Sequence, residues 1–123
     1  MGFNRRRDYV TTTGHTQHLI AGQWLCAGAG AITNLIGTGT GWSAGRTGVG
    51  TYSVTFAQPV TQPYCVLPAI FGVAQAAQSL PQVTSMTAGG FAITNLVVAT
   101  PTDIAATTGI QFAVHAAISS LTR

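Results

Sequence analysis

The stretch Thr51–Phe56 reads TYSVTF and alternates strictly between polar and apolar residues. A period of two places Tyr52, Val54 and Phe56 on one face of a strand and the small polar residues on the other. Strands with one buried and one solvated face are typical of antiparallel sheets. The stretch therefore predicts a half-buried β-strand, and similar runs lie on both sides of it.

Six further apolar runs of strand length are separated by Gly, Pro, Asn and Thr. The predicted strands are His18–Cys26, Ala29–Ile36, Thr51–Ala57, Tyr64–Gly72, Gln82–Thr87, Phe91–Ala99 and Gly109–Ser119. Between them, Gly37–Gly50 is predicted to be a long loop, and Val73–Ser79 either a short helix or a loop. Short strands with frequent turns indicate an all-β fold, a jelly-roll-like antiparallel β-sandwich over residues 18–123.

Charged residues are rare along the whole chain. Asp, Glu, Lys and Arg make up 6% of the 123 residues, whereas an average soluble domain has roughly 25%. There is no Lys and no Glu, and the acids are Asp8 and Asp103. A free monomer normally keeps a mixed, charged surface. Either the chain is a soluble β-domain with a threonine-rich surface, or copies of itself or a larger scaffold cover much of it. We favour the second interpretation and expect a homo-oligomer.

Residues 1–17 are predicted to form an extended basic N-terminal arm without periodicity. Arg5, Arg6 and Arg7 are adjacent there, and Asp8, Tyr9 and a threonine run follow. Such an arm is either a disordered tail or a tether along a neighbouring protein. Because no apolar stretch follows the arginines, we expect no signal peptide and synthesis in the cytoplasm. The apolar runs fall short of the ~20 residues of a spanning helix, so no membrane is expected.

Side chains that carry out chemistry are few and dispersed. General acid–base catalysis usually needs a His or a carboxylate with a partner, but Asp8 lies in the arm and Asp103 in a turn. His15, His18 and Cys26 could chelate a metal in isolation, yet no C-x-x-C or H-x-x-x-H spacing is present. His115, within the last predicted strand, is interpreted as a histidine at an interface or hydrogen-bonded in the core. We expect no enzymatic activity, metal or cofactor.

The two cysteines, Cys26 and Cys65, each lie among apolar residues. Cysteine in such a context is usually a small buried hydrophobe. We expect two buried thiols, while a disulfide and a reactive thiol stay open as alternatives.

A phosphate or nucleic-acid ligand is also not expected. A phosphate-binding loop needs a following helix and a fixed polar residue, but Gly48–Gly50 leads into a predicted strand and the chain has no Lys. The sequence pI near 9.4 reflects few charges rather than many basic ones. Specific phosphate recognition draws on several Lys or Arg side chains.

Most aromatic residues fall on predicted strands and are assigned to the core. They are Trp24, Tyr52, Phe56, Tyr64, Phe71, Phe91 and Phe112. Trp42 lies in the predicted loop Gly37–Gly50 and is the best candidate for an exposed contact residue, together with Arg46. A buried position for Trp42 stays open.

The stretch Ala44–Phe56 reads AGRTGVGTYSVTF and resembles an R-x-G-x-G-x-Y-x-V-x-F pattern of bacteriophage structural proteins. In those proteins the pattern enters a strand of a small β-sandwich, found in tail-fibre tips and capsid-decorating knobs. Pro59, Tyr64–Val66 and Gly90–Ile93 continue the likeness, which covers roughly residues 44–118.

The resemblance implies a trimeric knob without catalytic residues. Tail-fibre tips follow a long shaft, whereas this sequence has a short basic arm, so it looks more like a capsid decoration (cement) protein. The expectation is a structural virion protein on the capsid exterior that oligomerises, as a trimer, and binds the shell of the major capsid protein. Arg5, Arg6, Arg7 and Tyr9 are the expected capsid contacts. The alternative is a head-fibre or tail-fibre tip domain that binds a host receptor or glycan.

Overall fold

The computed structural model describes residues 7–10, 16–72, 79–106 and 108–117, and these form ten β-strands and one 3-10 turn. The strands are β1 (Arg7–Val10), β2 (Thr16–Ala27), β3 (Gly30–Ile36), β4 (Trp42–Gly48), β5 (Thr51–Phe56), β6 (Thr61–Gly72), β7 (Ser79–Thr87), β8 (Gly90–Val97), β9 (Thr100–Pro101) and β10 (Thr108–Ala117). The turn η1 (Thr38–Thr40) precedes β4. The named strands all pair antiparallel.

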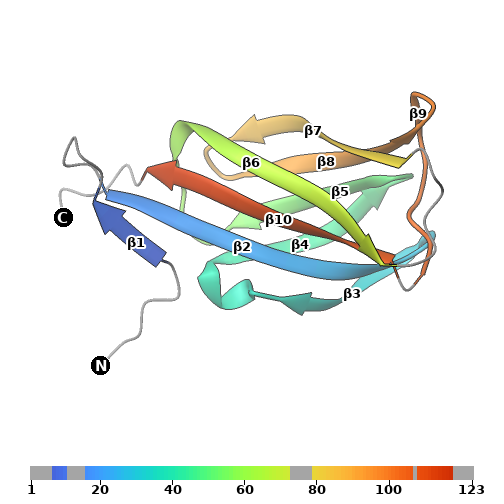
Figure 1. The fold of residues 1–123 in the computed structure, drawn as a ribbon, viewed down its shortest axis with the longest axis horizontal. Coiled ribbons are helices and arrows are strands. Elements are labelled where there is room, and N and C mark those ends of the chain that lie inside the picture. Colours follow the sequence, from blue (N-terminus) through green and yellow to red (C-terminus); the bar gives the residue numbers. More distant parts are fainter. Residues whose placement is uncertain (1–6, 11–15, 73–78, 107, 118–123) are drawn as a thin grey trace.

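The strands form two five-stranded sheets. The first sheet has the order β1-β2-β10-β6, with β3 also paired to β2; the second has the order β4-β5-β8-β7, with β9 paired to β8. Figure 1 shows β2, β10 and β6 crossing in front of the strands of the second sheet. This arrangement confirms the predicted antiparallel β-sandwich.

Large side chains from both sheets fill the space between them. Tyr52, Val54 and Phe56 point inward from β5, as their alternation predicts, and are buried. Trp42 and Phe112 meet edge-on with ring centroids 5.0 Å apart, and Phe91 packs on Phe112 at 5.4 Å. Further buried members of this core are Ile20, Trp24, Cys26, Val60, Tyr64, Ile93, Ile104, Ile110, Val114 and Ala116. Such aromatic pairs contribute beyond the area that they bury.

Two segments predicted to lie outside the strands belong to the sheets. Arg7–Val10 pairs with Thr16–Leu19. The prediction that residues 1–17 form an arm outside the sandwich is therefore wrong for Arg7–Val10 and for the first two residues of β2. Trp42–Gly48 is strand β4 rather than part of a loop, and it pairs with β5. Its core-facing residues are separated by glycine and small polar residues, which hid the alternation. For the segment Val73–Ser79, residues 73–78 lie outside the described residues, and Ser79 begins β7.

Trp42 is 4% exposed, so its predicted role as an exposed contact is wrong. Its indole Nε1 donates to the carbonyl oxygens of Gly37, at 2.7 Å, and Ala21, at 3.1 Å. A Cβ atom on Gly22 would overlap the indole ring. The loop before β4 therefore positions Trp42 above β2, where only a glycine leaves room for it. In the described residues no helix is long and apolar enough to cross a membrane.

Candidate interaction surfaces

In the described part of the chain no three His, Cys, Asp or Glu side chains are grouped so that they could hold a metal ion. Cys26 and Cys65 are both free thiols. Cys26 is buried as predicted, whereas the prediction is wrong for Cys65, which is exposed on β6. Burial raises the pKa of Cys26, so this thiol is held in its protonated, unreactive form.

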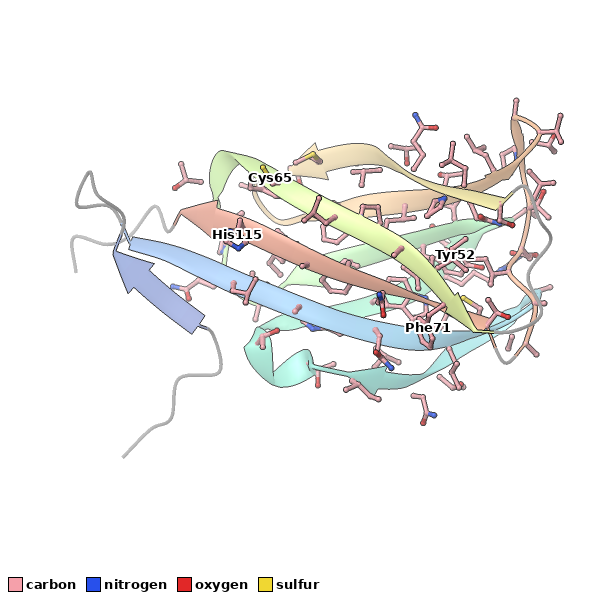
Figure 2. All side chains as sticks on the ribbon, viewed as in Figure 1. Tyr52, Cys65, Phe71 and His115 are labelled. Carbon is pink, nitrogen blue, oxygen red and sulfur yellow. The ribbon has the colours of Figure 1, made fainter. Side chains whose placement is uncertain are left out.

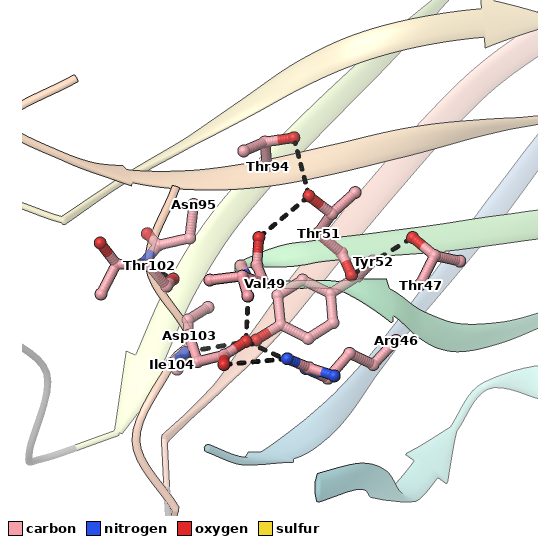
Figure 3. Close-up of polar contacts among 11 residues, drawn as sticks. Arg46, Thr47, Val49, Thr51, Tyr52, Thr94, Asn95, Thr102, Asp103 and Ile104 are labelled. Carbon is pink, nitrogen blue, oxygen red and sulfur yellow. Dashed lines mark hydrogen bonds and ion pairs between the residues drawn. The ribbon is translucent and has the colours of Figure 1, made fainter. Parts of the chain in front are cut away.

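The carboxylate of Asp103 is enclosed by donors from β4 and the β4–β5 turn (Figure 3). Asp103 Oδ1 accepts hydrogen bonds from Arg46 Nε at 3.0 Å and from the Gly50 backbone N at 2.7 Å, while Oδ2 accepts from Arg46 Nη2 at 3.0 Å. The Arg46 hydrogen bonds lower the pKa of Asp103, and the pairing raises the pKa of Arg46. Asp103 therefore stays ionised and paired, which makes it a structural group rather than a general acid or base.

Neighbouring contacts extend this cluster along the segment after β9. The backbone N of Ile104 donates to the Tyr52 hydroxyl oxygen at 3.2 Å, and Asn95 Nδ2 donates to the Thr102 carbonyl at 2.9 Å. Burial raises the pKa of Tyr52, so its phenol is neutral. Together these bonds close one end of the sandwich. Arg46 is consequently a partly buried structural residue, contrary to its prediction as an exposed contact.

The outer face of the second sheet is a surface of hydroxyl groups. Its outward-facing residues on β5, β8 and β7 are mostly Ser and Thr, among them Ser53 and Thr55 on β5 and Ser85 and Thr87 on β7. Side-chain hydroxyls bond to each other across strands, with Thr94 Oγ1 3.2 Å from Thr84 Oγ1. This face follows the usual rule for antiparallel sheets, in which one side is polar and solvated.

The outer face of the first sheet breaks that rule. Strand pairing aligns its outward residues in four rows that run across β2, β10 and β6: Leu19–His115–Cys65, Ala21–Ala113–Leu67, Gln23–Gln111–Ala69 and Leu25–Gly109–Phe71. None of these residues is Asp, Glu, Lys or Arg, and most are apolar. Figure 2 shows Cys65 and His115 near one end of the adjacent strands β6 and β10, and Phe71 near the other end of β6. The prediction that Phe71 belongs to the core is therefore wrong, because it is on the outward side of β6. We call these twelve residues the apolar face.

Leu67 stands on the apolar face between two hollows. It is 70% exposed. One hollow, of about 420 Å³, has a floor of small residues that includes Ala21, Ala69 and Ala113, with Ile36 at its rim. The other, of about 260 Å³, lies between Leu67, Ala113, Cys65 and His115. Leu67 therefore stands beside a shallow hollow that is lined by Ala21, Ala69 and Ala113 together with Gln23 and Gln111.

A second apolar patch lies at the β8–β9 turn. Leu80, Leu96, Val98 and Ala99 line it, and Val98 is 73% exposed. Val98 and Ala99 have φ angles of 48° and 64°. Valine rarely adopts this left-handed conformation, because its branched Cβ crowds the backbone. The turn therefore holds an apolar residue in solvent at a conformational cost.

Of the remaining predicted contact residues, the structure describes Arg7 and Tyr9. Arg5 and Arg6 lie outside the described residues, as does His15. The backbone of Arg7 and Tyr9 forms part of β1. His115 lies exposed on β10, within the apolar face and outside the core.

Sequence reasoning missed the apolar face, although it carries a signal. Tyr64–Phe71 reads YCVLPAIF, so both sets of alternate residues are apolar, unlike the alternation in β5. A strand of this type is usually buried on both sides. Here only one side faces the core, and the other side is the apolar face.

Comparisons with protein-family models, curated proteins and solved structures found no match for this chain. Its function is therefore argued from the surfaces themselves. The most informative of them are the apolar face and the hydroxyl surface on the opposite sheet.

Proposed function

We propose that this chain is a non-enzymatic structural protein of a bacteriophage virion, a capsid decoration protein. It oligomerises on the capsid exterior and binds the shell of the major capsid protein, which it stabilises. The observation that carries this proposal is that the outward side chains of β2, β10 and β6 and of the second sheet include no Asp, Glu, Lys or Arg. Proteins that stay monomeric keep charge on their surfaces to resist association. An uncharged sandwich suits a protein that is covered in use.

The charged cluster of Arg46 and Asp103 is consistent with this role. These side chains neutralise each other and fasten the loop after β9. They leave no free carboxylate for acid–base chemistry at that end of the sandwich. The likeness of Ala44–Phe56 to phage β-sandwich proteins supports the choice of a virion as the assembly.

The experiment is a sedimentation assay with empty shells of the major capsid protein encoded by the same phage genome. We expect saturable binding to the shells and a higher melting temperature of the decorated shells. Deleting Met1–Gly14 would also remove strand β1, so the arm is better tested by the triple variant Arg5→Ala, Arg6→Ala, Arg7→Ala. Exposed ion pairs contribute only ~0–1 kcal/mol each, so the three substitutions together should weaken shell binding measurably. Absence of binding at micromolar concentrations would reject decoration.

A fibre-tip domain that binds a host glycan is the second candidate, and the hydroxyl surface favours it. Ser53, Thr55, Ser85 and Thr87 line a shallow polar hollow of about 160 Å³ on the second sheet. Their hydroxyls can donate and accept hydrogen bonds with sugar hydroxyls. Because Trp42 is buried, it offers no stacking surface to a sugar. Glycan-array binding that the double variant Ser53→Ala, Ser85→Ala removes would favour this candidate over decoration.

A further inference from the structure

We infer that the apolar face of the first sheet is a two-fold interface at which a second copy of this chain docks. The inference rests on the proposed function as an assembling structural protein, and it identifies a second copy of this chain as one of its binding partners. In this arrangement Leu67 of each copy enters the alanine-lined hollow of the other.

The apolar face differs from ordinary exposed apolar residues. Single surface leucines are common and need no explanation. Here apolar side chains continue across three paired strands, from Leu19 and Ala21 on β2 through Ala113 on β10 to Leu67 on β6. The opposite sheet, built from the same number of strands, presents hydroxyl groups. One chain thus has a solvated sheet face and a face that water solvates poorly.

The apolar face is complementary to itself. The protruding Leu67 and the hollow floored by Ala21, Ala69 and Ala113 occupy the same surface. A two-fold axis placed midway between Leu67 and this hollow would set each leucine against the other copy's hollow. A buried apolar anchor in a pocket is the usual form of an energetic hot spot.

Charge also favours a second copy over an unrelated charged partner. Because the twelve residues of the face include no Asp, Glu, Lys or Arg, pairing two copies removes no charged side chain of this face from water. A charged partner would lose hydration without gaining an ion pair here. A like-with-like pairing avoids that cost.

The size of the face can be compared with that of a standard dimer interface. Strands lie about 4.8 Å apart and rise about 3.4 Å per residue, so the apolar face, three strands wide, covers on the order of 350 Å² in projection, before side-chain relief is counted. A standard interface buries about 800 Å² of accessible surface per partner. The apolar face thus forms the centre of such an interface, and contacts from the neighbouring strands β1 and β3 have to supply the rest of the area.

Proline residues oppose pairing at one pair of sheet edges. The edge strand of the first sheet, β6, contains Pro68, and the edge strand of the second, β7, contains Pro81. Proline lacks the N–H that continues a ladder and is a common protection of edges against another chain. The two prolines therefore oppose association in which another chain pairs with these edge strands. They do not oppose association through the outer face of the first sheet. A surface that meets itself requires a two-fold axis, so this contact gives a dimer rather than the trimer that the phage resemblance implies.

The test compares two variants with the same substitution on opposite sheets. Leu67→Glu places a charge on the apolar face, and Leu80→Glu, at a site 58% exposed, places it on the second sheet.

Light scattering and sedimentation equilibrium give the mass of the protein in solution. We expect wild type and Leu80→Glu at twice the 12.6 kDa of the chain. Leu67→Glu should raise the dimer dissociation constant at least ~100-fold, because both copies lose a hot-spot residue. Below the dimer dissociation constant, where mass action adds no stability, both substitutions should leave the unfolding temperature nearly unchanged, because both sites are exposed.

Cys65 provides an independent readout that needs no substitution. It is exposed on the apolar face, whereas Cys26 is buried in the core, so a thiol reagent reports on Cys65 in the folded protein. If a second copy covers the face, alkylation of Cys65 should slow as wild-type protein is concentrated through the dimer dissociation constant. In Leu67→Glu the rate should be independent of concentration.

Three outcomes would overturn the inference: a wild type that is monomeric up to millimolar concentration, a dimer that Leu80→Glu dissociates and Leu67→Glu does not, or a trimer. The shell assay separates these from failure of the proposed function. If the protein forms dimers that depend on Leu67 but does not bind capsid shells, the interface is supported and the proposed decoration function is rejected. Monomers that bind shells reject the interface and leave decoration intact.

Discussion

At the scale of single residues, groups that suggest chemistry in the sequence have structural roles in the fold. Arg46 and Trp42 were predicted as exposed contacts because both lie in a glycine-rich stretch. The fold turns Trp42 into the core and pairs Arg46 with Asp103, 57 residues later in the chain. No local pattern encodes such a distant pairing, so sequence alone could not assign these roles. The alternation of Tyr52, Val54 and Phe56 is local, and it predicted their burial correctly.

The Asp103 carboxylate makes acid stability testable. Arg46 lowers the folded-state pKa of Asp103, so the unfolded chain binds this proton more tightly. The resulting stability is complete above the unfolded pKa of about 3.9 and is lost as pH falls through the lower folded pKa. We expect the wild-type melting temperature to fall below about pH 5. Asp103→Asn should melt several degrees lower at pH 7 and show a flatter acid profile, measured by circular dichroism.

Asp8→Asn is the matched control, since Asp8 and Asp103 are the two acidic side chains of the sequence. It should keep the wild-type acid profile. An Asp103→Asn profile as steep as that of wild type would show that the Arg46–Asp103 pair does not govern acid stability.

Gly22 gives a second test at the residue scale. A methyl group there would overlap the Trp42 indole, whereas a Cβ on Gly45 would have no atom within 4 Å. Overpacking of this kind costs about 1–3 kcal/mol. We expect Gly22→Ala to lower the free energy of unfolding by that amount in urea titrations. Gly45→Ala, on β4, should change it by less than about 0.5 kcal/mol. Equal stabilities would mean that Trp42 can move without loss of packing.

At the scale of elements, local patterns located strands well but not their limits. Seven predicted strands appear, each shifted by up to a few residues, because apolar alternation and turn residues are local properties. The structure adds β1, β4 and β9. β4 was missed because Gly45 and Gly48 made it look like part of a loop, and the two-residue β9 is too short to show a period. Strand order is set by long-range pairing, such as that of β2 with β10, which alternation does not predict.

The β8–β9 turn offers a stabilising substitution. Both of its central residues, Val98 and Ala99, have positive φ, as in a type I′ turn, which prefers Asn-Gly. Left-handed conformations cost roughly 1–2 kcal/mol per ordinary residue. We expect Val98→Asn with Ala99→Gly to raise the free energy of unfolding by about 1–2 kcal/mol and the melting temperature by several degrees. Ala99→Gly alone should give a smaller increase. A lower melting temperature would show that the Val98 side chain packs more firmly than its exposure indicates.

At the scale of the whole molecule, the two sheets present opposite kinds of surface. The low charge of the sequence predicted a covered surface but could not say which face is covered. That distinction depends on which strands share a sheet. Pairing gathers Leu67, Ala113 and Ala21 in one row, while β5 and β7 gather hydroxyl groups on the other side. The apolar face thus becomes visible only once the strands are assembled.

This separation predicts that the two proposed contacts differ in their sensitivity to salt. Salt shortens the Debye length from about 10 Å at 0.1 M to about 3 Å at 1 M and so screens exposed charge pairs. The apolar face has no Asp, Glu, Lys or Arg to screen, so its dimer dissociation constant should change less than about threefold over that range. The dimer dissociation constant should rise on cooling, since apolar association weakens at low temperature.

Binding of Arg5, Arg6 and Arg7 to acidic groups of a shell should weaken markedly as salt rises over the same range of concentration. Sedimentation of the protein alone and with shells, from 0.1 M to 1 M NaCl, measures both. Dimers that dissociate in salt would assign self-association to charged residues instead of the apolar face.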